Sequence, residues 1–141
     1  MRILVGVDGS EHARRAVSWC AKYAPALGAE VVAVHAIETP VYAVPTMAYV
    51  PIPPLSEEER RTLHDTIRTE WCGELERAGV AYRVVSAEGP PASVIIEVAQ
   101  HEDAELVVTG RRGRGGFAEL VLGSTSHSLT HHLQRPLVIV P

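Results

Sequence analysis

Residues 105–124 read Glu-Leu-Val-Val-Thr-Gly-Arg-Arg-Gly-Arg-Gly-Gly-Phe-Ala-Glu-Leu-Val-Leu-Gly-Ser. The first five residues are typical of a short strand that is buried on both faces of a sheet. A glycine-dense loop follows, and Ser124 after Gly123 is placed to cap a helix. Glycines free backbone N–H groups and a helix N-terminus carries positive partial charge, so this strand–loop–helix unit predicts a phosphate site. The alternative is a surface loop that its three arginines keep solvated.

Outward from this unit, apolar strands alternate with helical patterns along the whole chain. Consecutive strands joined by helices indicate a parallel sheet covered on both faces. The sequence therefore predicts one doubly wound α/β domain over residues 1–141, with a five-stranded parallel sheet of order 3-2-1-4-5. The expected strands are residues 3–7, 31–37, 82–87, 106–109 and 137–140.

Two of the expected helices carry clear boundary signals, and two more are expected at residues 91–101 and 124–132. Ser10 should cap the first helix and Gly28 should end it, with Pro25 kinking it or ending its regular part early. Ser56 and Glu59 form a capping-box pattern that opens a helix to about residue 78. Its apolar residues recur every four positions, which predicts a buried stripe of Leu63, Ile67, Trp71 and Leu75.

Residues 39–55 form a variable, proline-rich segment that holds five of the chain's 10 prolines. Neither a regular helix nor a central strand tolerates that density of proline. The segment is too apolar for a simple linker, so it should pack on something. Three placements remain open: a lid over a ligand crevice, a contact surface for a partner, or a loop folded back over the core.

Length and composition narrow the class of protein. With 141 residues and 46% hydrophobic residues, the chain is long enough for one domain with a real core. A net charge of −4 argues against nucleic-acid binding, and the chain has neither a membrane-length apolar run nor a signal-peptide pattern, so we expect a soluble cytoplasmic protein. Cys20 and Cys72 form neither a redox motif nor a zinc motif and should be buried thiols.

In an open parallel sheet, ligands bind where the strand order reverses, at the carboxyl ends of the strands. Here the reversal lies between the first and fourth strands. Asp8 follows the first strand, and Thr109 and Gly110 end the fourth, so two polar turns far apart in sequence should converge there.

The glycine pattern of this region is specific. Gly110, Gly113, Gly123 and Ser124 follow G-x2-G-x9-G-[S/T], the pattern of the nucleotide-binding subgroup of the universal stress protein family. The resemblance extends through residues 5–10, 35–37 and 136–140, and covers nearly the whole chain.

The resemblance implies an ATP-binding domain. By position, Gly110, Gly113, Gly123, Ser124 and Thr125 would hold phosphates and ribose. Thr109 at the end of the fourth strand and Arg112 of the loop would lie beside them. Val7, Asp8 and Ala36 would line the ribose and adenine. It also implies a homodimer, in which the last strand, residues 137–140, pairs across a two-fold axis and so covers an apolar edge.

Several side chains keep two interpretations. Asp8 is placed either to meet a divalent ion such as Mg²⁺ or the ribose, or to form an Asx turn before the first helix. Arg112 and Arg114 either clamp phosphates or point to solvent. His127 and His131 have a metal-compatible spacing but no evident third ligand, so we expect no metal there. His35 should be a core histidine with satisfied hydrogen bonds.

The leading functional hypothesis is a regulatory stress-response protein that binds ATP and at most hydrolyses it slowly. The chain has no Walker lysine, no HxGH and no GxGxxG after a strand, which argues against a fast enzyme of those classes. Cyclic AMP, ADP or another nucleotide is the alternative ligand. Two other functions stay open: a metal-dependent hydrolase that uses Asp8, or an interaction module that acts through the proline-rich segment.

Overall fold

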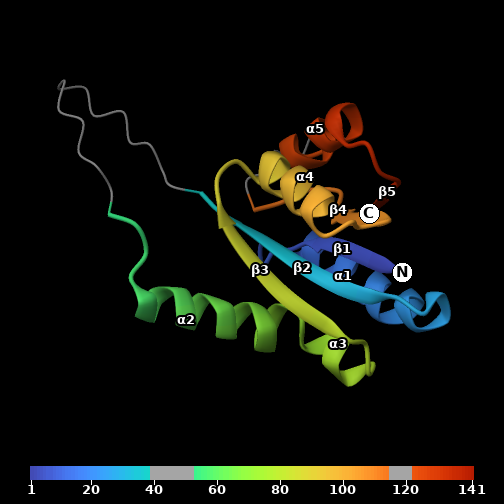
Figure 1. Ribbon diagram of the computed structural model, residues 1–141, viewed down its shortest axis with the longest axis horizontal. Coiled ribbons are helices and arrows are strands. Elements are labelled where there is room, and N and C mark those ends of the chain that lie inside the picture. The colour runs from blue at the N-terminus through green and yellow to red at the C-terminus, as the bar shows by residue number, and fades with distance from the viewer. Residues whose placement is uncertain (39–52, 115–121) are drawn as a thin grey trace.

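The computed structural model describes residues 1–38, 53–114 and 122–141 as a twisted five-stranded sheet between two layers of helices (Figure 1). All four strand pairings are parallel, and the order is β3-β2-β1-β4-β5, as the sequence predicts. The strands are β1 (Arg2–Gly6), β2 (Glu30–Ile37), β3 (Tyr82–Glu88), β4 (Leu106–Gly110) and β5 (Leu137–Val140).

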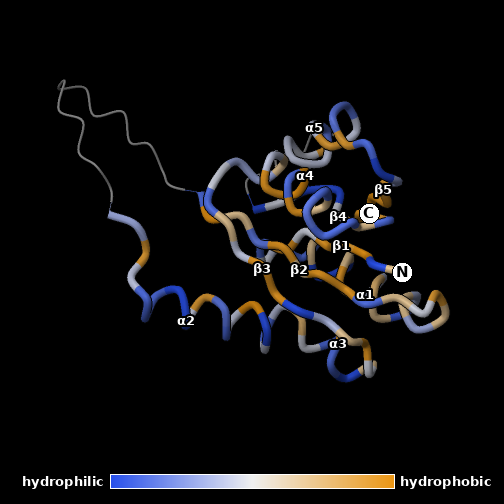
Figure 2. Tube along the Cα trace, in the orientation of Figure 1, coloured by the Kyte–Doolittle hydropathy of each residue, from blue (hydrophilic) through white to orange (hydrophobic). Residues whose placement is uncertain are grey.

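Alternating side chains of the central strands divide the core in two. Ile3 and Val5 of β1 face α1 (Glu11–Leu27), whereas Leu4 faces α4 (Pro91–His101) and α5 (Ser124–His132). These side chains are completely buried, which is why the strands read as continuous apolar runs. Figure 2 shows the same concentration of hydrophobic residues along the middle of the sheet.

Helix α1 begins as the sequence indicates. The Ser10 hydroxyl accepts a hydrogen bond from the Ala13 N–H at 3.2 Å, and Gly28 ends the helix in the left-handed region at φ 58°. The expectation that Pro25 ends the regular helix early is wrong, because the helix continues to Leu27. Pro25 lies in the last turn, where the missing N–H costs a single backbone bond.

The helix expected from Ser56 to residue 78 is interrupted. Its capping box is present, but α2 (Glu57–Thr66) passes into a π-helical turn, η1 (Ile67–Trp71), before the short α3 (Gly73–Arg77). The widened turn is closed by the Cys72 N–H, which donates to the Ile67 carbonyl at 2.9 Å. A stripe with strict four-residue spacing rotates around a 3.6-residue helix, and a wider turn helps to keep such a stripe on the core side.

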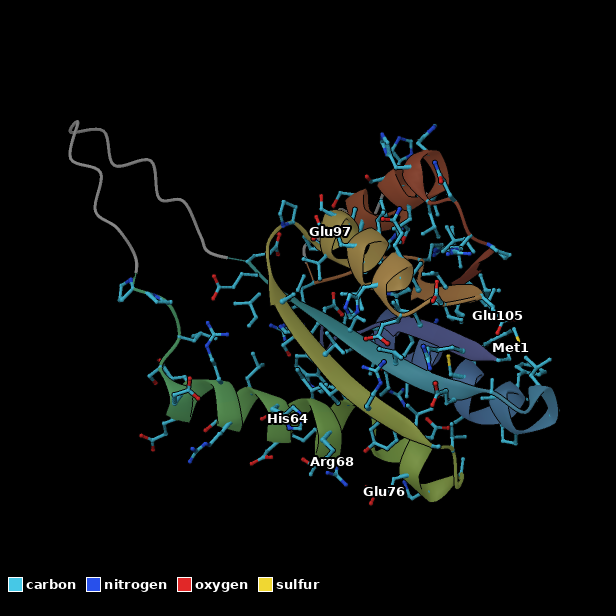
Figure 3. All side chains as sticks on the ribbon, in the orientation of Figure 1. Met1, His64, Arg68, Glu76, Glu97 and Glu105 are labelled. Atoms are coloured by element: carbon cyan, nitrogen blue, oxygen red, sulfur yellow. The ribbon has the colours of Figure 1, made fainter. Side chains whose placement is uncertain are left out.

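Ile67 and Leu75 are buried as predicted, while Leu63 and Trp71 are partly buried against the same core. On the outer face of this segment, the side chains of His64, Arg68 and Glu76 are exposed (Figure 3). The segment therefore covers the α1 side of the sheet with one apolar face only.

The two cysteines lie in this core. Cys20 of α1 and Cys72 are free, fully buried thiols, as expected. Burial raises the pKa of each thiol from 9.0 to about 12. Both are therefore neutral in the folded protein near physiological pH.

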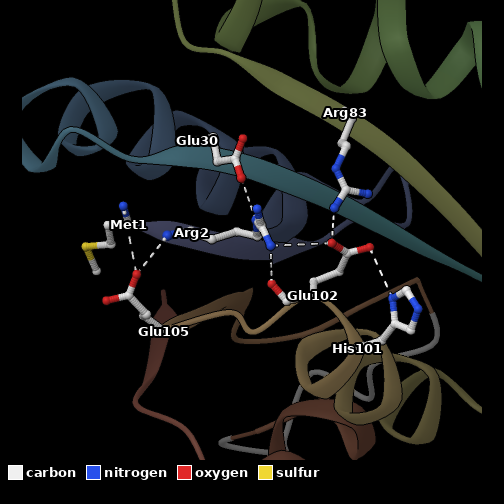
Figure 4. A network of polar contacts seen from close by, with 7 residues as sticks. All are labelled: Met1, Arg2, Glu30, Arg83, His101, Glu102 and Glu105. Carbon is white, nitrogen blue, oxygen red and sulfur yellow. Dashed lines mark hydrogen bonds and ion pairs between the residues drawn. The ribbon is translucent and has the colours of Figure 1, made fainter.

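A network of ion pairs joins the sheet at its amino-terminal edge (Figure 4). Arg2 bonds Glu30 at 2.5 Å and lies 3.7 Å from the Glu102 carboxylate, which also pairs with Arg83. The hydrogen bond from Arg2 lowers the pKa of Glu30. Glu102 has 13% of its side chain exposed, so it is the most buried member and links β1, β3 and the end of α4.

Within the described residues, no helix combines the length and the apolar character that crossing a membrane requires. Most of the proline-rich segment, residues 39–52, lies outside the described residues, and so do residues 115–121 of the glycine-dense loop. The hypotheses about a lid or partner surface in residues 39–55 therefore stay predictions.

Candidate functional site

A cavity of about 660 Å³ opens at the carboxyl edge of the sheet, where the strand order reverses between β1 and β4. The ends of β1, β2 and β4 form its base, and the glycine-dense loop and the front of α5 form one wall. All ten residues selected from the sequence border this cavity: Val7, Asp8, Ala36, Thr109, Gly110, Arg112, Gly113, Gly123, Ser124 and Thr125. The structure thus brings together turns that are more than 100 residues apart.

Asp8 joins two of these turns. Its Oδ1 accepts a hydrogen bond from the Ser10 N–H at 2.9 Å, which is the Asx turn that the sequence allowed. Its Oδ2 accepts from the Arg114 N–H at 3.1 Å. Among the described residues, no group of three or more histidine, cysteine or acidic side chains is arranged to hold a metal. The two hydrogen bonds of Asp8 tie the glycine-dense loop to the end of β1.

The glycines of the pattern let backbone segments approach one another. A Cβ on Gly110 would lie 2.5 Å from the His12 carbonyl group, so β4 ends directly against the first turn of α1. A Cβ on Gly113 would lie 2.6 Å from Asp8 Oδ2. A side chain at position 113 would therefore meet the Asp8 carboxylate.

Gly123 is the N-cap of α5, which corrects the expectation that Ser124 caps this helix. The Gly123 carbonyl accepts from the His127 N–H at 2.9 Å, so Ser124 is already the first helical residue. In the described part of the chain, no side chain caps α5. Because the first N–H groups of a helix lack intrahelical acceptors, those of Ser124 and Thr125 are donors beside the cavity.

A buried hydroxyl fixes the front of α5 to the end of β4. Ser126, 2% exposed, donates its Oγ–H to the Gly110 carbonyl at 2.7 Å, and the Thr109 hydroxyl donates to the same carbonyl at 3.2 Å. The Arg111 carbonyl accepts from the Gly123 N–H at 2.8 Å. The strand end, the loop and the helix front are therefore one connected unit. Sequence reasoning missed Ser126, although it lies two residues after Ser124 on the same turn.

His35 and Trp71 also differ from their expected roles. The His35 Nδ1–H donates to the Val7 carbonyl at 2.8 Å, so its hydrogen bond is satisfied as predicted, but the ring is only partly buried and lines the cavity. Trp71, expected only as core, meets the His35 ring edge-on at 5.2 Å. The position of His35 near the carboxyl end of β2 was the signal for its place at the cavity.

The cavity carries charges of both signs. Asp8 and Glu38 contribute carboxylates, and Arg112 and Arg114 contribute guanidinium groups. Arg112 is partly buried, with its backbone against Gly123, and Arg114 is exposed. Arg112 and the positive end of α5 lie on the same wall, so that wall favours an anion. The Arg114 guanidinium lies instead against Trp71 and Gly9. His127 and His131 lie outside the cavity, exposed on α5 with ring centroids 4.7 Å apart.

Known proteins that resemble this chain match it over nearly its whole length. Residues 1–141 match the profile of the universal stress protein family. The chain is 33% identical to the universal stress protein encoded in the QAH/OAS sulfhydrylase 3' region of Thermus aquaticus, over 98% of this chain and 96% of the relative.

Solved structures share the fold. Universal stress protein UspA from Lactobacillus plantarum superposes with a TM-score of 0.79 at 20% identity, over 100% of this chain and 97% of that one. A universal stress protein in complex with cAMP gives 0.73 at 22% identity, over 99% and 95%. The Archaeoglobus fulgidus protein in complex with dAMP gives 0.70 at 20% identity, over 100% and 98%. The full-length profile match and the relative at 33% identity show that the chain belongs to the universal stress protein family.

Proposed function

We propose that this protein binds an adenine nucleotide, ATP together with Mg²⁺, in the cavity between β1 and β4 and acts as a regulatory stress-response protein. The observation that carries the proposal is the convergence of the glycine-dense loop and the uncapped front of α5 on one cavity at the reversal of strand order. Its volume falls within the range of roughly 300–1,000 Å³ that small-molecule sites occupy.

The anionic part of the ligand belongs on the wall formed by the loop and α5. There the first N–H groups of α5, the hydroxyls of Ser124 and Thr125, and the guanidinium of Arg112 are donors, and Gly110, Gly113 and Gly123 let the backbone close. We assign the ribose and adenine to the opposite wall, formed by Val7, Asp8 and Ala36, with Thr109 at the base. Structures of family members with cAMP and dAMP support an adenine ligand for this fold.

We assign Asp8 an indirect role toward Mg²⁺. Both of its carboxylate oxygens already accept backbone hydrogen bonds, so its contact with the ion would run through water or the nucleotide. A carboxylate engaged in this way positions the loop and is poorly placed to activate water. We therefore propose a protein that binds ATP and hydrolyses it slowly at most.

Isothermal titration calorimetry tests the proposal with ATP, ADP, AMP, cyclic AMP and GTP, each with and without Mg²⁺. Wild type and a Gly113→Val variant are compared, with Gly73→Ala as control, because a Cβ at Gly73 meets no atom within 4 Å. We expect adenine nucleotides to bind wild type and the control alike and to bind the Gly113 variant more weakly. Absence of binding to wild type by all five nucleotides would refute the function, and equal binding to the Gly113 variant would place the site elsewhere.

We also propose that the protein is a homodimer in which β5 (Leu137–Val140) pairs with its copy. Among the described strands, β5 lies at the end of the sheet beside β4 alone, and each of its four apolar residues is partly exposed. An apolar edge strand with unpaired backbone groups is stabilised by pairing with a second strand.

A further inference from the structure

The guanidinium of Arg114 packs on an aromatic ring at the rim of the cavity. Its Cζ lies 5.2 Å from the centroid of the Trp71 ring, a distance at which a cation is attracted to the face of an aromatic ring. Arg114 both lines the cavity and is exposed, so it stands where the cavity meets solvent. Gly9 packs against this pair, because a Cβ there would lie 2.7 Å from Arg114 Nη2 and 2.7 Å from Trp71 Cζ2.

Two contacts hold the Trp71 indole in place under the guanidinium. Trp71 is the last residue of η1, which the bond from the Cys72 N–H to the Ile67 carbonyl closes. The His35 ring meets Trp71 edge-on, and His35 is itself held by the Val7 carbonyl. The π-helical turn thus brings an indole from the α2–α3 segment to the end of β1.

The backbone of Arg114 is anchored as well, while its charge is available. Asp8 accepts from the Arg114 N–H at 3.1 Å, which holds the residue next to Gly113. Arginines elsewhere, such as Arg14 and Arg60, pair with carboxylates. In the ranges that the structure describes, the Arg114 guanidinium forms no such ion pair and contacts an aromatic face. A pre-positioned cation of this kind suits an anionic group of a ligand.

We propose that Arg114, positioned by Trp71, is a specificity-determining residue that makes this site prefer nucleoside di- and triphosphates over monophosphates and cyclic nucleotides. The inference rests on the proposed function. Arg112, by contrast, is partly buried, and its backbone packs against Gly123 at the front of α5. A cation at the rim reaches only the part of a ligand that extends outward, and the planar guanidinium fork binds a terminal phosphate through two hydrogen bonds.

Calorimetry of ATP, ADP and AMP with wild type and Arg114→Gln tests the inference, with Arg61→Gln of α2 as a matched exposed arginine. A hydrogen bond from a charged donor is worth about a tenfold change in affinity or more. We expect Arg114→Gln to lose about tenfold or more for ATP and ADP but less than about threefold for AMP. Arg114→Lys keeps the charge without the fork and should fall between wild type and Arg114→Gln.

The positioning role of Trp71 has its own measurements. Trp71→Leu should lower the ATP-to-AMP affinity ratio in the same direction as Arg114→Gln, and Trp71→Phe, which keeps an aromatic face, should largely retain it. The chain has two tryptophans, and Trp19 packs on Tyr23 within α1, so a Trp19→Phe background reports Trp71 alone. In that background, ATP should change the Trp71 emission because a phosphate binds the guanidinium that lies over the ring, and AMP should leave the emission unchanged.

The outcomes separate the two proposals. If wild type binds adenine nucleotides but Arg114→Gln keeps the same ATP-to-AMP ratio, the selectivity inference is wrong and the proposed function stands. If wild type binds none of the three nucleotides, both proposals fail. Equal Trp71 emission changes with ATP and AMP would also overturn the assignment of Arg114 to the outer phosphates.

Discussion

The carboxylate of Asp8 accepts a hydrogen bond from the backbone N–H of Arg114, which lies 106 positions later in the chain, at 3.1 Å. The other carboxylate oxygen closes the turn at Ser10 at 2.9 Å. One side chain therefore holds the end of β1 and the glycine-dense loop together at the cavity. A Cβ at the neighbouring Gly113 would collide with this bridge, 2.6 Å from Asp8 Oδ2.

Replacing Asp8 with alanine should loosen the loop without unfolding the protein. Two backbone donors lose a charged acceptor in a partly exposed position, so we expect the free energy of unfolding to fall by about 1–3 kcal/mol. Hydrogen exchange should accelerate at the Ser10 and Arg114 amides, and nucleotide affinity should decrease. Asp65→Ala, an exposed acid of α2, is the control. Unchanged protection of the Arg114 amide would contradict this role of Asp8.

The order of the sheet could be predicted because strands and helices alternate along the sequence. The central strands are apolar on both faces, which indicates a parallel sheet covered by helices on each side. The ends of the strands follow too, so the sequence also indicates which turns meet. The π-helical turn could not be predicted, because apolar residues spaced four apart also occur in regular α-helices. For that reason Trp71 reads as core, and its contact with Arg114 emerges only when η1 and the loop are placed together. The cap of α5 at Gly123 is similarly set by the bond of its N–H to Arg111, a tertiary contact.

Gly110 and Gly113 should respond differently to the same substitution. Gly110→Ala forces a methyl group against the backbone of α1, 2.5 Å from His12, so we expect a loss of about 2–3 kcal/mol in the free energy of unfolding. Gly113→Ala meets only the Asp8 carboxylate on an exposed loop and should cost less than about 1 kcal/mol while weakening nucleotide binding. Urea unfolding and calorimetry measure the two effects. Equal losses of stability would show that the loop at Gly113 is as tightly packed as the strand end.

Glu102 should contribute more to stability than its neighbour Glu105. Its carboxylate, 13% exposed, contacts both Arg2 and Arg83, whereas Glu105 is 61% exposed. We expect Glu102→Ala to lower the free energy of unfolding by about 1–3 kcal/mol and Glu105→Ala by less than about 0.5 kcal/mol. A double-mutant cycle with Arg83→Ala isolates the pair. A coupling energy near zero would mean that the Glu102–Arg83 pair does not contribute to the stability of the fold.

The buried thiols should make the protein sensitive to alkali. In the unfolded chain each thiol ionises near its ordinary pKa of 9.0, whereas in the folded protein the pKa of Cys20 and of Cys72 is about 12. Unfolding therefore releases protons between these values, so the stability contributed by the neutral thiols is complete below pH 9 and is lost as pH rises toward 12. Between pH 8 and 11, the free energy of unfolding measured with urea should fall less steeply for the Cys20→Ala/Cys72→Ala double variant than for wild type. The same pH dependence of unfolding for wild type and the double variant would contradict this prediction. Rapid thiol labelling of the native protein at pH 8 would contradict the burial of the thiols.

The free edge of β5 offers a direct test of the proposed homodimer. The carbonyls of Pro136 and Val140 accept hydrogen bonds from Val107 and Arg111 on the β4 side, at 2.9 and 2.8 Å. Because backbone groups alternate along a strand, the N–H of Ile139 faces away from β4.

Ile139→Pro should therefore spare the β4–β5 ladder and remove a donor from the outer edge, where proline is tolerated in a monomer. We expect sedimentation to show a dimer at micromolar concentration for wild type and at least about a hundredfold weaker association for the variant, since each lost edge hydrogen bond costs about 1 kcal/mol and the ring blocks close approach. Ser86→Pro on β3, the opposite edge, is the matched control, because the alternation set by the bonds at Ala81 and Gly89 turns its N–H away from β2, and it should leave the dimer intact. A wild type that remains monomeric, or a dimer lost through Ser86→Pro and retained through Ile139→Pro, would assign the β5 edge no role in assembly.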